Sequence, residues 1–241
     1  MKHLSVIIPA HLQEKTIVKD LNAISKTLQK IRYPAEIIVV IDGQKDKTFQ
    51  KAKKLKLKNL KVYLIKKNQG KGFAVRFGMK KAKGNLIAFL DAGMEIDPNG
   101  ISMLLEHMEW YDADIMVGSK RHLASKVTYP LDRRILSYAY YLLVRLLFGV
   151  KIKDTQSGIK IFKRKVLEKI LPKLVVKKYA FDIEILSVAH RLGFKKIYEA
   201  PIKLSYKFGS LTDAATIRTI YHMLYDTLAV FYRLKFLKYY D

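Results

Sequence analysis

The chain has 241 residues, half of them hydrophobic, which is enough for one domain with a buried core and argues against a disordered protein. Its 46 Lys and Arg against 21 Asp and Glu give a formal net charge of +25, which favours anionic partners, although a Lys-rich surface adapted to heat would carry the same charge. Disulfides and thiolate metal sites are excluded because there is no cysteine, and neither a zinc-enzyme His spacing nor a nucleic-acid-binding motif is present.

The first part of the chain predicts four strand–helix units of a parallel α/β sheet. Short apolar runs typical of buried strands occur at residues 4–9, 36–41, 62–66 and 85–90. Helices are expected between them, at residues 14–31, 49–55 and from the 68–72 turn to residue 83. Ligands bind such sheets at the carboxyl ends of the strands, where polar segments follow at residues 9–14, 42–48, 68–71 and 91–95.

The second part is less regular but shows no linker that would separate a further domain. Strands are expected at residues 115–119, 159–162 and 197–200, and helices at residues 101–110, 134–148, 164–170, 182–192 and 216–239. The apolar run 135–150 is interrupted by Arg145 and is too short to span a bilayer. We expect one domain, 1–241, with a nucleotide-binding half (1–97), an acceptor half (98–210) and a C-terminal amphipathic helix (211–241).

The strand ends carry residue types that suit a nucleoside diphosphate and a cation. Asp91 directly follows a buried strand, where a carboxylate can hold Mg²⁺ or Mn²⁺ against two phosphates or simply cap the next segment. The 68–72 turn (NQGKG) brings backbone N–H groups and Lys71 to a helix start, which suits an anion. Asp42 can accept hydrogen bonds from a nucleobase or ribose, or serve only in its turn.

Basic residues beside an apolar helix suit a phosphate carried by a lipid. Lys120, Arg121 and Arg133 precede Ser137 and its Tyr- and Leu-rich helix, and Arg grips phosphate with two parallel hydrogen bonds. The stripe of apolar residues on the terminal helix favours either a membrane interface or docking on the protein's own core.

These segments together resemble family 2 glycosyltransferases with the GT-A fold, in the dolichol-phosphate mannose synthase-like branch. The resemblance rests on VIIPAHLQE, IIVVIDGQKDKT and NQGKGFAVRFGMKKAKGNLIAFLDAG, and on GSKR, RRILS and DTQSGIKIFKRKVLE further along the chain. It implies an α/β, Rossmann-like GT-A fold with a mixed, mostly parallel sheet flanked by helices and a C-terminal amphipathic helix.

The resemblance also implies roles for individual residues. Nucleotide binding falls to Pro9, Ala10, His11, Gln13, Glu14, Asp42, Lys71 and Ala92. Catalytic roles fall to Asp91, Lys120, Arg121 and Arg133, cation binding to Asp91 and Glu95, and the acceptor phosphate to Arg133, Ser137 and Lys207.

The chain departs from the family's motifs at several positions. His11 and Gln13 replace the Tyr and first Glu of P-A-Y-N-E-E, and Ile41 replaces the first Asp of V-D-D-G. Gly93 replaces the second Asp of D-A-D, which leaves the dependence on a metal open. Glu95 is the nearby carboxylate that can reach a cation instead.

The resemblance implies inverting transfer of a hexose, mannose or glucose, from GDP-mannose or UDP-glucose to dolichyl or polyprenyl phosphate, with Mg²⁺ or Mn²⁺. A phosphate acceptor is already anionic near neutral pH, whereas a sugar or protein hydroxyl would need a general base such as Asp154 or Asp182. A non-catalytic nucleotide- or lipid-binding relative is the third alternative. The expected location is cytoplasmic and peripheral, on the anionic inner face of the cell membrane, with no nucleic acid as partner.

Overall fold

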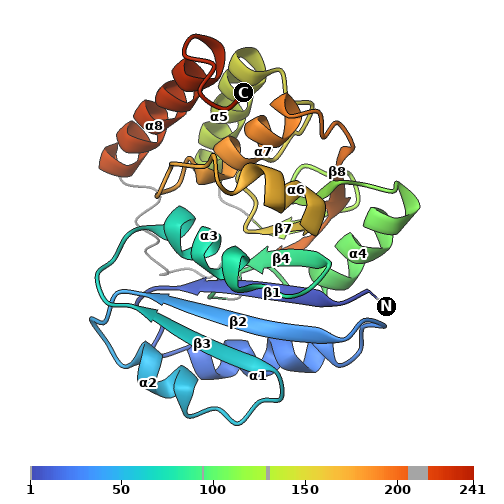
Figure 1. Ribbon diagram of the computed structural model, residues 1–241, viewed down its shortest axis with the longest axis vertical. Coiled ribbons are helices and arrows are strands. Elements are labelled where there is room, and N and C mark those ends of the chain that lie inside the picture. Colours follow the sequence, from blue (N-terminus) through green and yellow to red (C-terminus); the bar gives the residue numbers. More distant parts are fainter. Residues whose placement is uncertain (1, 94, 129–130, 206–216) are drawn as a thin grey trace.

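A seven-stranded sheet runs through the middle of the molecule in the computed structural model, which describes residues 2–93, 95–128, 131–205 and 217–241 (Figure 1). Its strand order is β3-β2-β1-β4-β7-β5-β8. The strands are β1 (Leu4–Ala10), β2 (Ala35–Asp42), β3 (Leu60–Ile65), β4 (Leu86–Leu90), β5 (Ile115–Ser119), β7 (Ile159–Lys163) and β8 (Ile197–Pro201). Strand β7 pairs antiparallel with β4 and β5, and the other neighbouring strands are parallel. The predicted mixed, mostly parallel sheet is confirmed.

Helices cover both faces of this sheet, so strands such as β1 and β2 are apolar on both sides and have unbroken apolar sequences (Figure 1). One face packs against α1 (Ile17–Leu28), α2 (Thr48–Lys53) and α4 (Gly100–Trp110). The other packs against α3 (Lys71–Lys81), α5 (Leu131–Phe148), α6 (Arg164–Ile170), α7 (Phe181–Arg191) and α8 (Ile217–Lys235). Successive side chains of β1 alternate between the two cores: Ile7 lies in one, Val6 and Ile8 in the other.

Two predicted boundaries were wrong for local reasons. The first helix starts at Ile17 rather than near Glu14, because the Gln13 carbonyl accepts hydrogen bonds from the N–H groups of Thr16 and Ile17 in a turn. The last helix ends at Lys235, and Lys238 then adopts a φ of 49°, a left-handed conformation that turns the chain back.

Sequence patterns did not reveal a second, two-stranded sheet formed by β6 (Lys126–Thr128) and β9 (Lys203–Ser205). Each strand has three residues, too few to display an alternating pattern. The Ser125 hydroxyl donates to the Ser119 carbonyl at 2.6 Å and accepts the Ile202 N–H at 3.0 Å. These bonds tie the segment after β5 to the sheet.

Helices α5 and α8 lie side by side at one end of the molecule (Figure 1). The Tyr140 and Thr227 hydroxyls are 3.0 Å apart in a buried contact, and the rings of Phe148 and Phe231 meet edge to face. Val230 of α8 is fully buried. The terminal helix therefore docks on the protein's own core along one side. No helix in the described ranges has both the length and the apolarity needed to cross a membrane.

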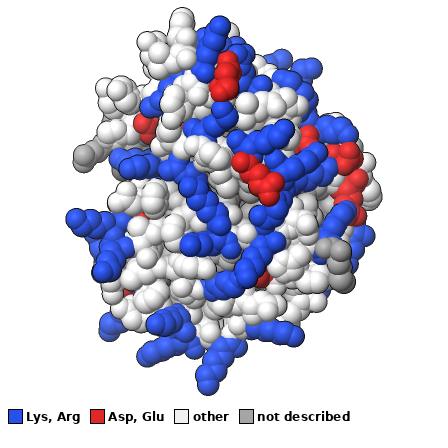
Figure 2. Space-filling model, viewed as in Figure 1, with Lys and Arg blue, Asp and Glu red and all other residues white. Residues whose placement is uncertain are grey.

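Positive charge is spread over the face of the protein shown in Figure 2 rather than gathered in one patch. Lys and Arg side chains extend across most of the face shown in Figure 2, whereas Asp and Glu occupy a few places on it. This distribution follows from the excess of 46 basic over 21 acidic residues.

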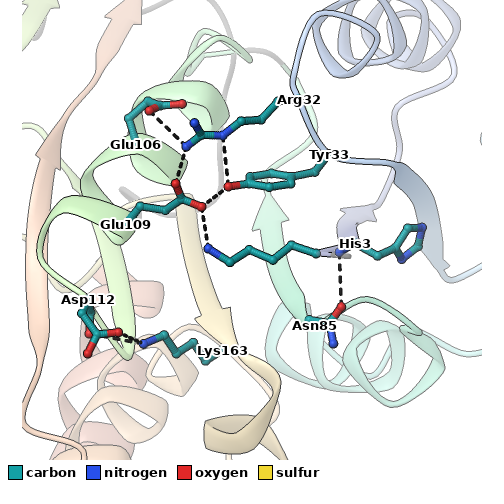
Figure 3. A network of polar contacts seen from close by, with 9 residues as sticks. His3, Arg32, Tyr33, Asn85, Glu106, Glu109, Asp112 and Lys163 are labelled. Carbon is teal, nitrogen blue, oxygen red and sulfur yellow. Dashed lines mark hydrogen bonds and ion pairs between the residues drawn. The ribbon is translucent and has the colours of Figure 1, made fainter.

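A polar network lies at the amino ends of the parallel strands, which we call the amino-edge network (Figure 3). Glu109, near the end of α4, binds Lys2 at 2.6 Å and also contacts Arg32 and Tyr33. Asp112 accepts hydrogen bonds from Lys163 at 2.6 Å and from Lys196 at 2.7 Å. These two lysines hold the pKa of Asp112 below its ordinary value. The network joins the start of the sheet to α4, on the edge opposite to the predicted ligand site.

Candidate active site

Asp42, at the end of β2, holds the loop that follows β3. Its two carboxylate oxygens accept the N–H groups of Gln69 at 2.8 Å and Gly70 at 2.7 Å. The side chain is buried, so these bonds replace the water that the carboxylate gives up. Asp42 thus shapes the NQGKG turn, and its predicted contact with a nucleobase or ribose stays a prediction.

His11 joins the loop after β1 to the same turn. Its Nδ1 lies 2.5 Å from the backbone oxygen of Asp42, and the side-chain nitrogen of Asn68 lies 3.2 Å from the imidazole. Pro9 and Ala10 are buried at the end of β1. Three of the predicted nucleotide-binding residues therefore lie at the carboxyl edge of the sheet, next to the turn that Asp42 holds.

The loops after β1 and β2 are cross-linked by Asp46 and Thr48. The Gln13 N–H donates to the Thr48 hydroxyl at 2.8 Å, and the Glu14 N–H donates to Asp46 at 3.2 Å. Glu14 in turn accepts the Lys47 N–H at 3.0 Å. Burial raises the pKa of Asp46, but the hydrogen bonds from Thr48 outweigh it and lower the pKa. The carboxylate is held ionised, as this linking role requires.

Asp91, at the end of β4, packs against the backbone of Gly158. The Asp91 N–H donates to the Gly158 carbonyl at 2.9 Å, and a Cβ on Gly158 would stand 2.4 Å from Asp91 Oδ2. Only glycine leaves room for this carboxylate. Lys71 Nζ donates to Asp91 Oδ2 at 2.8 Å. Within the described residues, Asp91 Oδ1 is buried and accepts no hydrogen bond.

That buried oxygen fits a divalent cation, because hard cations bind carboxylate oxygens and an unsatisfied buried acceptor is costly. The described part of the chain holds no group of three or more Asp, Glu or His able to surround a metal by itself. This donor set suits Mg²⁺ or Mn²⁺ in a site that takes its remaining ligands from substrate phosphates and water. Ala92 and Glu95 belong to the same loop, and their predicted roles stay predictions.

Gly93 departs from the family's Asp for a reason visible in the backbone. Its φ is +96°, a region that glycine adopts and other residues avoid. The Gly93 N–H donates to Asp20, a buried residue of α1, at 3.2 Å. An Asp at position 93 would be strained in this loop, so the substitution and the loop conformation belong together.

Four charged side chains form a row in which the sign of the charge alternates. We call this row the carboxyl-edge network, and it consists of Asp91, Lys71, Asp182 and Lys160. Lys71 Nζ lies 2.8 Å from Asp91 Oδ2 and 3.5 Å from Asp182 Oδ2. Lys160 Nζ lies 2.5 Å from Asp182 Oδ1. Burial raises the pKa of Asp182, but Lys160 and Lys71 outweigh that effect and lower it. An acid held in its ionised form between two cations is poorly suited to act as the general base predicted for a hydroxyl acceptor.

A second site opens beside α5. This cavity, of about 570 Å³, is lined by Lys120, Arg121, Val127, Arg134, Ile135, Ser137, Tyr138, Ala139 and Leu142. Arg121 donates to the Ser137 hydroxyl at 2.9 Å, and its guanidinium lies over the rings of Tyr138 and Tyr141. The cavity therefore has cationic and hydroxyl groups beside an apolar wall. It brings together Lys120, Arg121 and Ser137, which the sequence predicted for a phosphate carried by a lipid, and it adds Arg134.

The two remaining predicted acceptor residues are not placed by the structure. Lys207 lies outside the described residues, and so does the side chain of Arg133, whose backbone belongs to α5.

The segment 154–158 connects the two sites. Asp154 accepts the backbone N–H of Lys120 at 2.9 Å and lies 3.2 Å from its ammonium, while Gly158 packs on Asp91. Asp154 is buried and paired in this way, so it too is poorly suited to be a general base. The cavity beside α5 and Asp91 are thus joined through five residues.

Comparison with known proteins identifies the family. The family model described as glycosyl transferase family 2 matches residues 5–171. The chain belongs to glycosyl transferase family 2. It is a glycosyltransferase, as the resemblance predicted.

The relatives of the chain include dolichyl-phosphate beta-glucosyltransferases from three organisms. The one from Dictyostelium discoideum is 33% identical over 228 residues, which cover 88% of this chain and 69% of the relative. The one from Drosophila melanogaster is 34% identical over 205 residues, covering 78% and 63%. The one from Homo sapiens is 31% identical over 221 residues, covering 85% and 67%. These matches confirm the predicted dolichol-phosphate branch.

Solved structures show the same fold at low identity. Glucosyl-3-phosphoglycerate synthase from Mycobacterium tuberculosis, in complex with uridine diphosphate, has a TM-score of 0.72 and 17% identity, covering 96% of this chain and 79% of that one. Mannosyl-3-phosphoglycerate synthase from Rubrobacter xylanophilus has a TM-score of 0.73 and 14% identity, covering 98% and 75%. The predicted GT-A fold is confirmed.

Proposed function

We propose that the chain transfers glucose from UDP-glucose to a dolichyl or polyprenyl phosphate, with inversion at the anomeric carbon. The observation that carries this proposal is the cavity beside α5, where Arg121 and Ser137 meet the apolar wall of Ile135 and Leu142. A phosphate with a hydrocarbon tail matches that combination of groups. The activity named for the relatives supports both dolichyl phosphate and glucose. Mannose from GDP-mannose is the alternative donor.

In this mechanism, Arg121 and Ser137 bind the acceptor phosphate and aim one of its oxygens at the anomeric carbon. That oxygen is anionic near neutral pH, so no general base has to remove a proton. Lys120 stands in the same cavity, held by Asp154, and adds positive charge around the acceptor. The pairing of both candidate bases, Asp154 and Asp182, is a further reason to prefer a phosphate over a hydroxyl acceptor.

The nucleoside diphosphate leaves from the carboxyl edge of the sheet. Lys71, at the start of α3, and the turn held by Asp42 favour its negative charge. Asp91, with its unsatisfied Oδ1, would hold Mg²⁺ or Mn²⁺, which when bound supplies charge neutralisation for the departing diphosphate. Complexes of the Mycobacterium tuberculosis enzyme with Mn²⁺ and UDP-glucose support a divalent cation and this donor.

We also propose that the outer side of α5 and α8 rests on an anionic membrane, on its cytoplasmic face. Large apolar side chains remain exposed along both helices, among them Ile135, Leu142, Leu146, Tyr221, Tyr225, Leu228 and Tyr232. Such a face buries aromatic and aliphatic groups at the lipid boundary while the basic surface meets lipid headgroups. The acceptor cavity shares Ile135 and Leu142 with this face, so a lipid acceptor would enter it from the bilayer.

One assay tests the proposed function. The protein is incubated with Mn²⁺, polyprenyl phosphate and either radiolabelled UDP-glucose or GDP-mannose. We expect glucose label in the organic phase. Label only in a polar product would favour a hydroxyl acceptor, and nucleotide binding without transfer would indicate a non-catalytic relative.

Replacing the acceptor-binding arginine sharpens this assay. Arg121→Ala removes a hydrogen bond to a charged group, worth about 1.5–3 kcal/mol, so we expect KM for the lipid phosphate to rise about tenfold or more. Arg145→Ala, on α5 but outside the cavity lining, is the matched control and should leave KM unchanged. An unchanged KM in Arg121→Ala would contradict the assignment of the acceptor cavity.

A further inference from the structure

Lys160 is a fully buried lysine in the middle of the sheet, and no role has yet been assigned to it. It belongs to β7, between Ile159 and Ile161, and its side chain is inaccessible to solvent. A buried ammonium is costly unless it is paired and hydrogen-bonded. A chain that needed only a packed core here would lose nothing, and would often gain, by replacing Lys160 and its partner Asp182 together with apolar residues, so the buried pair calls for an explanation.

The ammonium of Lys160 is fully engaged with neighbours at the cation site. It donates to Asp182 Oδ1 at 2.5 Å and to the Ser157 carbonyl at 2.7 Å. It also lies 5.0 Å from the centre of the Phe89 ring, and Lys71 lies 5.6 Å from the same centre. Both lysines thus flank one aromatic residue of β4, two positions before Asp91.

Asp182 transmits the charge of Lys160 to the active site. Its Oδ1 binds Lys160, while its Oδ2 lies 3.5 Å from Lys71, which is 2.8 Å from Asp91. Lys71 is therefore shared between two carboxylates, and the shorter of its contacts is to Asp91. Without Lys160, Asp182 would carry an uncompensated charge and would draw Lys71 toward itself, because attraction between buried charges is weakly screened.

We propose that Lys160 is a positioning residue of the transferase: by neutralising one side of Asp182, it keeps Lys71 at Asp91 and so sets the geometry in which Lys71 and Asp91 meet the diphosphate and its cation. This inference rests on the proposed function, which assigns the diphosphate and cation to Lys71 and Asp91. Lys160 itself touches no substrate and acts through Asp182 and Lys71.

The test measures binding of UDP, with GDP as a second probe, by calorimetry at a series of Mn²⁺ concentrations. For Lys160→Met we expect the Mn²⁺ concentration at half-maximal nucleotide binding to rise about tenfold, the usual loss when a residue supporting a metal site is removed. The KM for polyprenyl phosphate should not change. Lys163→Met, the same substitution at the other end of β7, is the matched control and should bind as the unchanged protein does (Figure 3).

A double variant separates positioning from simple structural support. Lys160→Met with Asp182→Asn removes both charges and leaves Lys71 with Asp91, so we expect Mn²⁺-dependent nucleotide binding within about threefold of the unchanged protein. Such a recovery is non-additive, and only coupled residues show it. This variant also tests the proposal if Lys160→Met alone does not fold. Equally weak binding in the double variant would overturn it.

Asp91→Asn distinguishes failure of this inference from failure of the proposed function. If Asp91→Asn abolishes Mn²⁺-dependent binding but folded Lys160→Met binds normally, only the role of Lys160 falls. If Asp91→Asn does not change Mn²⁺-dependent binding, or if neither nucleotide binds the unchanged protein with Mn²⁺, the proposed function is wrong. The role proposed for Lys160 is then wrong as well.

Discussion

Two carboxylates at opposite edges of the sheet have the same kind of partners and very different surroundings. Asp112 in the amino-edge network and Asp182 in the carboxyl-edge network are each paired with two lysines, one of them on β7. The Asp112 side chain is 70% exposed, whereas that of Asp182 is 2% exposed. The two carboxylates have the same kind of partners, so we attribute any difference in their effect on the protein to burial.

Burial changes what an ion pair does for a protein. An exposed pair gains little, because water solvates both charges and salt screens them. A buried pair loses its hydration and is often no more stabilising than apolar residues of the same size, yet breaking it leaves a costly unpaired charge. The amino-edge network therefore links surface segments with little loss of hydration and little gain in stability. The carboxyl-edge network loses more hydration and lies where we propose that the diphosphate and its cation bind, which points to function.

The largest effect on stability is expected from Asp182→Asn. This variant leaves Lys160 buried without its counter-charge, which we expect to lower the free energy of unfolding by about 3–5 kcal/mol. Chemical denaturation followed by circular dichroism measures it. A loss of unfolding free energy no larger than that expected for an exposed ion pair would show that water reaches Lys160. The two networks would then not differ in their contribution to stability.

The next effect is on activity rather than stability. Asp91→Asn keeps the volume of the side chain but removes the charge beside Lys71, so we expect kcat/KM for sugar transfer to fall by about 100- to 1,000-fold, as when other preorganised charges are lost from active sites. Glu109→Gln, in the amino-edge network, is the control and should transfer at the normal rate. Near-normal turnover by Asp91→Asn would remove this carboxylate from the catalytic centre.

Sequence patterns predicted the sheet well because its strands are apolar on both faces. Runs such as those of β1 and β2 leave few alternatives to buried strands, and their polar ends predicted the ligand edge. The strands β6 and β9 escaped prediction since three residues carry no periodicity. Their existence depends on hydrogen bonds around Ser125, which join segments 77 residues apart.

Most residues of the candidate site were identified from the sequence, but the contacts between their side chains were not. Asp91 and Lys71 were both identified, yet their contact spans 20 residues and depends on how α3 packs on the sheet. Lys160 was overlooked although the sequence carries a signal, since a lysine between Ile159 and Ile161 interrupts an otherwise buried strand. Its partner, 22 residues away on α7, becomes visible only in the folded chain.

Glu36 tests whether burial, rather than location, separates the two networks, because it is a buried carboxylate at the amino ends of the strands. Burial raises the pKa of Glu36, but hydrogen bonds from Lys61, Ser5 and the Lys83 N–H outweigh it and lower the pKa below its ordinary value of 4.5. The ionised form therefore stabilises the fold fully above that value, and the gain is lost as the pH falls through the lower pKa of the folded state.

Glu36→Gln should accordingly lower the free energy of unfolding by about 2 kcal/mol at neutral pH, through the loss of charged hydrogen bonds. The difference from the unchanged protein should shrink as the pH falls from 4.5 through the lower pKa of the folded state, because Glu36 is neutral in both the folded and the unfolded protein only below that lower pKa. Denaturation curves at several pH values measure it. A difference that stays constant with pH would mean that the charge of Glu36 contributes nothing.

The smallest effect is expected from Asp112→Asn, the exposed counterpart of Asp182→Asn. Lys163 and Lys196 depress the pKa of Asp112, but all three side chains meet solvent, which screens their attraction. We expect no measurable shift of the unfolding midpoint at physiological salt, and at most a slight one at low ionic strength, where screening is weakest. Each of the two Asp→Asn variants removes one negative charge from between two lysines. A large and salt-independent loss at Asp112 would therefore show that pairing geometry matters more than burial, and the functional assignment of the carboxyl-edge network would lose its physical basis.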